Sequence, residues 1–184
     1  MEDFYSMKNR LVWMDLEMTG LDSQKDVILE IGAVVTDSDL NIVAEAPPIV
    51  INYSPEILAM IDEWSKSHHE VSGLLEKVRQ SSVDCRQAER MMLSFVSRYC
   101  IKGISPLCGN SVWQDRLFML KHMPDLEAFF HYRIVDVSSV KELVARWYPL
   151  IPPFEKTSAH RSLSDIRESI EELRYYRNKI FIHP

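Results

Sequence analysis

The sequence predicts a mixed α/β fold in which helices flank a five-stranded sheet. Short apolar runs of strand length fill the first third of the chain, helical periodicity dominates the rest, and two more strand candidates alternate with the helices. The chain has 184 residues, of which 46% are apolar and 26% charged, so it can bury a full core. We expect one domain spanning residues 1–184.

The first third predicts an antiparallel meander of three strands. Runs rich in Ile, Val and Leu form the first two strands, and an Asp-Ser-Asp turn leads into the third. Pro47 and Pro48 are expected to interrupt the third strand, which suits the edge of a sheet. The expected strands are residues 11–14, 27–36 and 40–43 with 49–51, and the turn is residues 37–39.

Helices are expected to dominate after Ser54. That residue supplies a capping hydroxyl, Pro55 takes the first helical position and Glu56 lies in the first turn. The last helix shows an apolar stripe of Leu163, Ile166, Ile170 and Leu173. The further expected helices are residues 82 or 84 to 99, 112–121, 138 or 139 to 148, and 162–178, with strands at residues 104–108 and 133–137.

Composition excludes several classes of protein. Lys and Arg total 21 against 27 Asp and Glu, and the net charge of −6 argues against a basic surface that coats long polyanions. No stretch approaches the roughly 18 consecutive apolar residues of a membrane span, and the first residues carry no secretory signal, so we expect a cytoplasmic protein. Cys85, Cys100 and Cys108 contain no Cys-x-x-Cys pair, which favours reduced thiols that fill apolar space.

Asp15 and Glu17 are the first candidate site residues. Side chains two apart on a strand point to the same side, so both acids share a face with Trp13. Adjacent like charges raise the pKa of at least one acid unless a cation neutralises them, and hard oxygen ligands suit Mg²⁺ or Mn²⁺. Alternatively, the two acids only mark the exit of the strand into the turn at Thr19 and Gly20.

Asp115 is the second candidate. It lies where a predicted strand leads into a helix, at the carboxyl edge where open α/β sheets bind ligands. It also fits an acid in the first turn of a helix, where the macrodipole favours negative charge.

His160 and Asp165 complete the set. Ser162 and Asp165 have the spacing of a capping box, which would make Asp165 only a helix-start residue. His160 is expected on the loop before that helix, free to approach a site from the side, or else simply solvated. Its ordinary pKa of about 6.5 suits proton removal from water near neutral pH.

Together these groups match a phosphodiesterase site with two divalent ions. Two cations about 3.5 to 4 Å apart would bridge the scissile phosphate, one presenting hydroxide and the other stabilising the departing oxygen. Without metal, the cluster would be destabilised by its own charge.

Four ordered motifs cover nearly the whole chain: residues 13–21 (WMDLEMTGL), 28–33 (ILEIGA), 108–116 (CGNSVWQDR) and 159–166 (AHRSLSDI). They resemble the DEDDh 3′→5′ exonucleases of the ribonuclease H-like superfamily, and more closely the oligoribonucleases. The resemblance implies a ribonuclease H-like fold and a homodimer. It implies a substrate of very short RNA, down to dinucleotides, cut from the 3′ end to nucleoside 5′-monophosphates as RNA decay finishes. The implied ligands of two Mg²⁺ or Mn²⁺ ions are Asp15, Glu17, Asp115 and Asp165, with His160 as general base.

The resemblance also implies substrate contacts. Leu21 and Trp64 match an apolar wedge against the bases, with core packing as the alternative for both. His69, which follows His68, matches a nucleotide-contacting histidine, and Tyr132 matches a residue that reaches the partner subunit's site. A cap on the 5′ phosphate is matched by Ser111, Arg133 and Ser138, and Lys141 could join it.

Three other functions stay as alternatives. An exonuclease directed at DNA or structured RNA would use the same chemistry. A noncatalytic nucleic-acid-binding module would not need all five polar residues. A phosphomonoesterase with an aspartyl nucleophile needs two aspartates at the first motif, and Glu17 argues against it.

Overall fold

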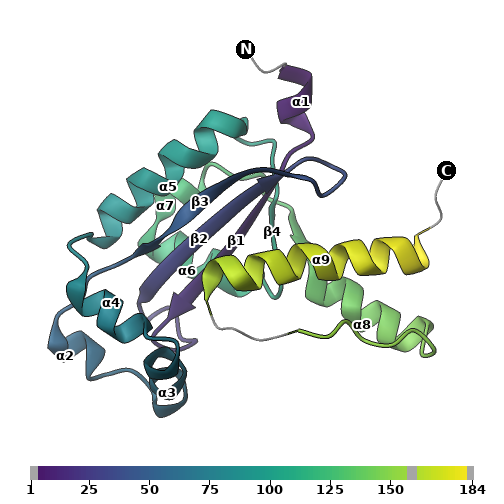
Figure 1. Ribbon diagram of the computed structural model, residues 1–184. Coiled ribbons are helices and arrows are strands. Elements are labelled where there is room, and N and C mark those ends of the chain that lie inside the picture. Colours follow the sequence, from purple (N-terminus) through teal and green to yellow (C-terminus); the bar gives the residue numbers. More distant parts are fainter. Residues whose placement is uncertain (1–3, 157–160, 182–184) are drawn as a thin grey trace.

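A five-stranded sheet with helices on both faces forms the centre of the computed structural model, which describes residues 4–156 and 161–181 (Figure 1). The strands are β1 (Leu11–Met18), β2 (Ile28–Thr36), β3 (Ile42–Val50), β4 (Leu107–Gly109) and β5 (Ile134–Asp136). Their order is β3-β2-β1-β4-β5, antiparallel from β3 to β1 and parallel from β1 to β5. The predicted mixed α/β fold is confirmed.

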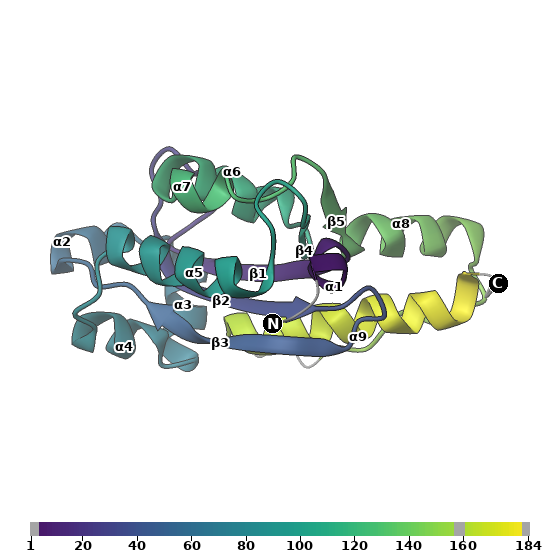
Figure 2. The ribbon, with the colours of Figure 1, turned by 90° about the horizontal axis from the view of Figure 1, so that it is seen from above.

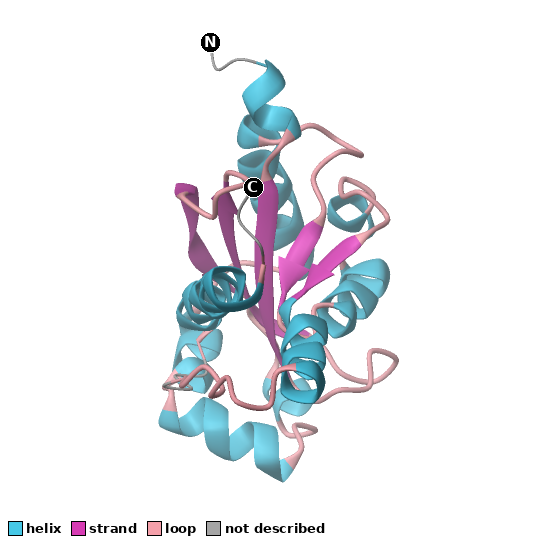
Figure 3. Ribbon diagram, turned by 90° about the vertical axis from the view of Figure 1, so that its right-hand side faces the viewer, coloured by secondary structure: helices cyan, strands magenta, loops and turns pink. Residues whose placement is uncertain are grey.

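Helices lie on both sides of this sheet (Figure 3). They are α1 (Phe4–Lys8), α2 (Pro55–Leu58), α3 (Glu63–Val71), α4 (Leu74–Gln80), α5 (Cys85–Tyr99), α6 (Trp113–His122), α7 (Pro124–Glu127), α8 (Val137–Trp147) and α9 (Ser162–Ile180). The short helices α2, α3 and α4 gather at one end of the molecule (Figure 2). Across the described ranges, no helix combines the length and apolar character that a membrane crossing requires.

The alternating side chains of β1 contribute to two separate cores. Val12, Met14 and Leu16 pack on one face in a cluster with residues of α5, α6 and α7. Trp13 packs on the other face under α9, against Ile166 and Ile170 of the predicted stripe. The side of β1 that faces α9 is also the side that carries Asp15 and Glu17.

The structure corrects two expectations about strands and helix ends. β3 runs unbroken through Pro47 and Pro48, with a shift of register beside them, because an edge strand does not need every N–H group for pairing. The helix begins after Ser54 as expected and ends at Leu58, but the expected capping hydrogen bond from the Ser54 hydroxyl is not formed in the described residues.

The last helix, α9, starts at Ser162 as expected. Its N-cap is Arg161 and no side-chain cap is formed in the described residues, so the capping-box alternative for Asp165 is wrong. The hydroxyl of Ser162 donates instead to Glu30 Oε1 at 2.7 Å. The cysteines are free thiols, as expected, and Cys100 and Cys108 are buried.

Candidate active site

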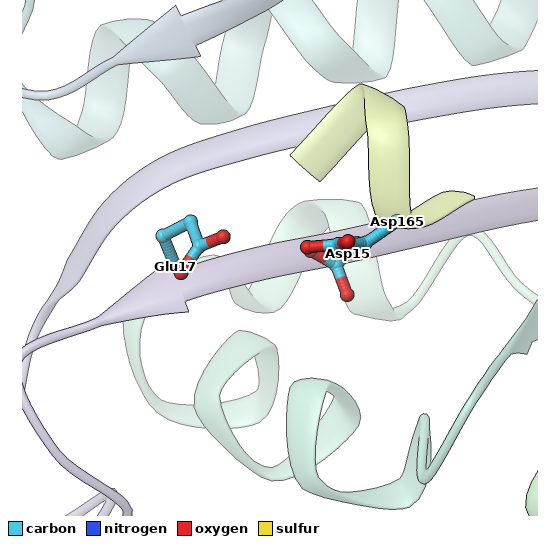
Figure 4. A group of neighbouring side chains, drawn as sticks. All are labelled: Asp15, Glu17 and Asp165. Atoms are coloured by element: carbon cyan, nitrogen blue, oxygen red, sulfur yellow. The ribbon is translucent and has the colours of Figure 1, made fainter. Parts of the chain in front are cut away.

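Three carboxylates meet where β1 passes beneath the first turn of α9. Asp15 and Glu17 come from β1 and Asp165 from α9 (Figure 4). One oxygen from each lies within 4.8 Å of the oxygens of the other two. Residues about 150 positions apart in the chain are thereby brought to one point, whereas the capping-box alternative would have left Asp165 bonded to its own helix.

Asp115 adjoins this group from α6. It is buried in the first turn of that helix, and its Oδ1 accepts a hydrogen bond of 2.9 Å from the backbone N–H of Leu16. The bond attaches α6 to β1 between Asp15 and Glu17. The Asp115 carboxylate is not one of the three that lie within 4.8 Å of each other.

The electrostatics of the cluster oppose full ionisation. Burial, followed by the charges of Asp115, Glu17 and Asp165, raises the pKa of Asp15 well above its usual range. Burial also raises the pKa of Glu17 to about 8, and the nearby Arg161 guanidinium only partly offsets this. Burial raises the pKa of Asp115 to about 7, although the hydrogen bond from Leu16 lowers it. These groups must either hold protons or share a cation.

The donor set fits a hard divalent cation. Every candidate ligand atom is a carboxylate oxygen, the type that Mg²⁺ and Mn²⁺ prefer. The oxygens are close enough together for one ion to contact several of them, and its charge would remove the repulsion that raises their pKa values. An acidic cluster suited to divalent metal is therefore present.

His69 of α3 reaches the same end of β1. Its Nε2 donates to the backbone carbonyl of Met18 at 2.7 Å, directly after the register shift that follows Glu17. Burial lowers the pKa of this imidazole, which favours the neutral ring. Its buried Nδ1 has no hydrogen-bond partner among the described residues and lies 3.9 Å from Glu17 Oε2. The candidate general base, His160, lies outside the described residues.

The two residues expected to contact bases are exposed. The side chain of Leu21 is 74% exposed and that of Trp64 is 64% exposed, so the core-packing alternative is wrong for both. The backbone carbonyl of Leu21 accepts a 2.6 Å hydrogen bond from Gln114 Nε2, which ties the loop after β1 to α6.

Ser111 and Ser138 meet at the carboxyl edge of β4 and β5. Their hydroxyl oxygens are 3.1 Å apart, and Ser111, which has a left-handed backbone (φ 51°), donates its N–H to Asp136 Oδ1. Arg133 lies over the exposed ring of Tyr132, with 5.2 Å from its guanidinium carbon to the ring centroid. Lys141 is exposed on α8.

Two residues with structural links to the site were not assigned a role by the sequence. Glu30 is a fully buried acid in β2, and its signal was a charge inside an otherwise apolar strand. Arg116 donates to Glu127 and to the backbone carbonyls of His131 and Tyr132, so it fixes the loop that carries Tyr132 and Arg133. Its only signal was its position beside Asp115.

Comparison with known proteins identifies the family to which the chain is similar. A family model described as exonuclease matches residues 12–173. The oligoribonuclease of Dichelobacter nodosus is 58% identical over 178 residues, which is 96% of this chain and 98% of that protein. A probable oligoribonuclease of Dictyostelium discoideum is 52% identical over 172 residues, with 94% of this chain and 90% of that protein covered.

Solved structures resemble the fold as well. E. coli exonuclease I in complex with a dT13 oligonucleotide has a TM-score of 0.72 at 12% identity, with 94% of this chain matched. A second exonuclease I structure has a TM-score of 0.70 at 13% identity. This chain spans only about two-fifths of those longer chains, 42% and 41%, and at such identity the likeness concerns the fold.

The fold is a mixed five-stranded sheet of the ribonuclease H-like type with flanking helices. The chain belongs to the exonuclease family and, within it, to the oligoribonucleases. The resemblance drawn from the four motifs is confirmed, and so is the expectation of an enzyme of the exonuclease class.

Proposed function

We propose that this chain is a hydrolytic 3′→5′ exoribonuclease that cuts short oligoribonucleotides, dinucleotides above all, to nucleoside 5′-monophosphates at the end of RNA degradation. The observation that carries the proposal is the approach of Asp15, Glu17 and Asp165 to within 4.8 Å across distant parts of the chain. The oligoribonuclease relatives support short RNA as the substrate. We further propose that residues 1–184 form one exonuclease domain that works in the cytoplasm, which its free cysteines support.

The proposed ligands of two Mg²⁺ or Mn²⁺ ions are Asp15, Glu17, Asp115 and Asp165. Divalent ions bound there would neutralise the charge of a phosphodiester and lower the pKa of water. His160 is proposed as the general base, because its ordinary pKa lies near neutral pH.

The proposed substrate contacts flank this acidic group. Leu21 and Trp64, both exposed, would hold the bases between apolar surfaces. The Nδ1 of the neutral His69 ring, which has no hydrogen-bond partner among the described residues, would suit a hydroxyl donor such as that of ribose. For the 5′ phosphate, the proposed cap consists of Ser111, Ser138, Arg133 and Lys141.

A cap of this kind would account for the proposed preference for dinucleotides. If the 5′ phosphate is bound at a fixed distance from the acids, only the shortest RNA fills both ends. The net charge of −6 agrees, because affinity would not come from many phosphate contacts along a long strand.

A time course on 5′-labelled RNA tests the proposal. The purified protein is incubated with Mn²⁺ and a labelled dinucleotide, a 20-residue RNA and the matching DNA, at equal concentrations of ends. The dinucleotide should disappear fastest, and a chelator should stop the reaction. Accumulation of dinucleotides from the longer RNA, or faster cleavage of DNA, would overturn the substrate assignment, and a lack of any turnover would favour a binding module.

We also propose a homodimer in which Tyr132 reaches the partner subunit's site. Trp113, Leu117 and Leu120 lie on one side of α6 at helical spacing, and each is at least 43% exposed. Tyr132 is 71% exposed at the end of the loop that Arg116 fixes to this helix. A second copy would cover this apolar surface.

Replacing both Leu117 and Leu120 with Glu should yield a folded monomer with much weaker dinucleotide turnover. Sedimentation velocity measures the association state, and Leu143→Glu on α8, a comparably exposed leucine, serves as the control. A double variant that stays dimeric would contradict the α6 interface.

A further inference from the structure

One buried carboxylate attaches the first turn of α9 to the sheet. Glu30 in β2 is completely buried, and its oxygens accept hydrogen bonds from both residues at the start of the helix. Arg161 donates from Nη2 at 2.6 Å and from Nε at 3.3 Å. Ser162 donates from its hydroxyl at 2.7 Å and from its backbone N–H at 3.2 Å. The carboxylate therefore takes the place of the side-chain cap that α9 lacks.

The next position on the same face of β2 is a glycine, which allows α9 to lie close to the strand. Gly32 lies on the same face as Glu30, and a Cβ atom there would come within 2.7 Å of the Ser162 hydroxyl. In the ladder with β1, Glu30 pairs with Glu17 and Gly32 pairs with Asp15. The helix start is thus fixed beside the two β1 acids.

Asp165 lies one helical turn after Arg161, which is bound to Glu30. Its backbone N–H donates to the carbonyl of Arg161 at 3.0 Å, so the two residues move as one unit. Figure 4 shows the Asp165 side chain leaving the first turn of α9 toward Asp15. A shift of the turn relative to β2 would carry the Asp165 oxygens away from those of Asp15 and Glu17.

We propose that Glu30 is a positioning residue of the metal site, which acts through Arg161 and Ser162 to hold Asp165 against Asp15 and Glu17. The inference rests on the proposed function only in taking these three carboxylates as ligands of a divalent ion. Glu30 itself is occupied by four hydrogen bonds to the helix start. Loss of a supporting contact of this kind lowers metal affinity by about 10- to 100-fold in other proteins.

The test is Mn²⁺ binding to the metal-free protein, measured by calorimetry without RNA. Glu30→Gln should raise the Mn²⁺ dissociation constant by about 10-fold or more, because an amide cannot accept all of these hydrogen bonds. Arg161→Gln and the uncharged change Ser162→Ala should raise it as well. Circular dichroism and thermal melts establish that each variant is folded, and Ser162→Ala keeps every charge if Glu30→Gln fails to fold.

Two alternatives predict different results. If Glu30 and Arg161 act only through their charge, Glu30→Gln should weaken Mn²⁺ binding, Arg161→Gln should strengthen it, and Ser162→Ala should do nothing. If they merely stabilise the helix, then Ile170→Ala, which empties a buried position of α9, should weaken binding as much. Either outcome, or an unchanged dissociation constant in all three variants, would overturn the proposal.

A matched control lies on the same helix. Arg167 and Glu45 form a second two-point ion pair between α9 and the sheet, at 3.1 and 2.6 Å, and neither residue belongs to the candidate site. Arg167→Gln should leave Mn²⁺ affinity within about twofold of the wild type. Dinucleotide hydrolysis by the wild type is measured separately. If the wild-type protein binds Mn²⁺ but does not cut RNA, the proposed function is wrong and the positioning role still stands. If the wild-type protein binds no Mn²⁺, both proposals are wrong.

Discussion

The two faces of β1 differ in what they contribute to the molecule. Val12, Met14 and Leu16 alternate with the site residues and are buried in an apolar core with α5 and α6. Asp15 and Glu17, one position along, face α9 and place like charges at short distance. One face of the strand therefore carries burial alone, whereas the other combines the buried Trp13 with unfavourable electrostatics at Asp15 and Glu17. Burial on both faces stabilises the fold, and the acidic group is maintained in spite of its cost.

The largest expected effect follows from Asp15→Asn on the acidic face. Loss of a proposed metal ligand should slow dinucleotide hydrolysis by at least about 10³-fold, because several kcal/mol of transition-state stabilisation depend on the bound ions. The melting temperature of the metal-free protein should rise at neutral pH, since an amide replaces a carboxyl group whose ionised form is disfavoured by burial and by the neighbouring acids. Steady-state kinetics and calorimetry measure the two effects.

The exposed Asp125 in the first turn of α7 provides the control for that substitution, and Asp125→Asn should change neither quantity. Near-normal turnover by a folded Asp15→Asn protein would refute the assignment of the ligand. A fall in the stability of the metal-free variant would contradict the difference between the two faces.

Met14→Ala on the apolar face should have the opposite effects. Met14 is 1% exposed, and its truncation leaves a cavity that costs about 2–5 kcal/mol of unfolding free energy. Turnover per folded molecule should stay within about threefold of the wild type, because Met14 points away from the acids. Urea unfolding and kinetics below the unfolding transition test this, and a selective loss of metal affinity would show that the two faces are not independent.

The sequence predicted those features that depend on local geometry. The period of two along a strand places Asp15 and Glu17 on one face, and the helical period identifies Ile166 and Ile170 as buried residues of α9. Both patterns are properties of a single element. Both patterns are confirmed by the structure, because each strand or helix packs an apolar side against the core, whichever elements lie opposite.

Features that depend on distant partners were not available from local patterns. The spacing of Ser162 and Asp165 suggested a cap, but Glu30, 132 positions before Ser162, takes the hydroxyl of that serine instead. Likewise, the bond from Leu16 to Asp115 joins residues 99 positions apart. The interruption expected at Pro47 was wrong. A proline removes only its own N–H group from the pairing of a strand, and an edge strand leaves some N–H groups unpaired in any case.

The stability of the metal-free protein should fall as the pH rises, owing to the acidic face. Burial raises the pKa of Glu17 to about 8 and of Asp115 to about 7, so the folded state binds protons that the unfolded chain releases near pH 4. This contribution to stability is complete below about pH 4 and is lost as the pH rises to 7 or 8. The slope is at most about 1.4 kcal/mol per pH unit for each carboxylate.

Metal should reverse this loss. Saturating Mg²⁺ should raise the melting temperature more at pH 8 than at pH 5, because the ion replaces protons that are already absent at pH 8. Calorimetric scans with Mg²⁺ or with a chelator at both pH values provide the comparison, and Asp15→Asn should reduce the difference. An equal gain at the two pH values would mean that the buried acids do not control metal binding.

Substitution of Trp64 has the smallest expected effect, and it separates substrate binding from protein stability. Trp64 is 64% exposed on α3, and its ring centroid lies 4.0 Å from that of His68, so its removal should hardly change the melting temperature. A stacked base contributes about 1–3 kcal/mol, and Trp64→Ala should therefore raise the KM for a dinucleotide by about 10- to 100-fold. Trp64→Phe, which keeps an aromatic surface, should recover most of the loss.

Trp147 on α8 is 67% exposed and serves as the control, and Trp147→Ala should leave the KM unchanged. If the two tryptophans behave alike, exposure alone explains Trp64 and the proposed contact with the bases is wrong.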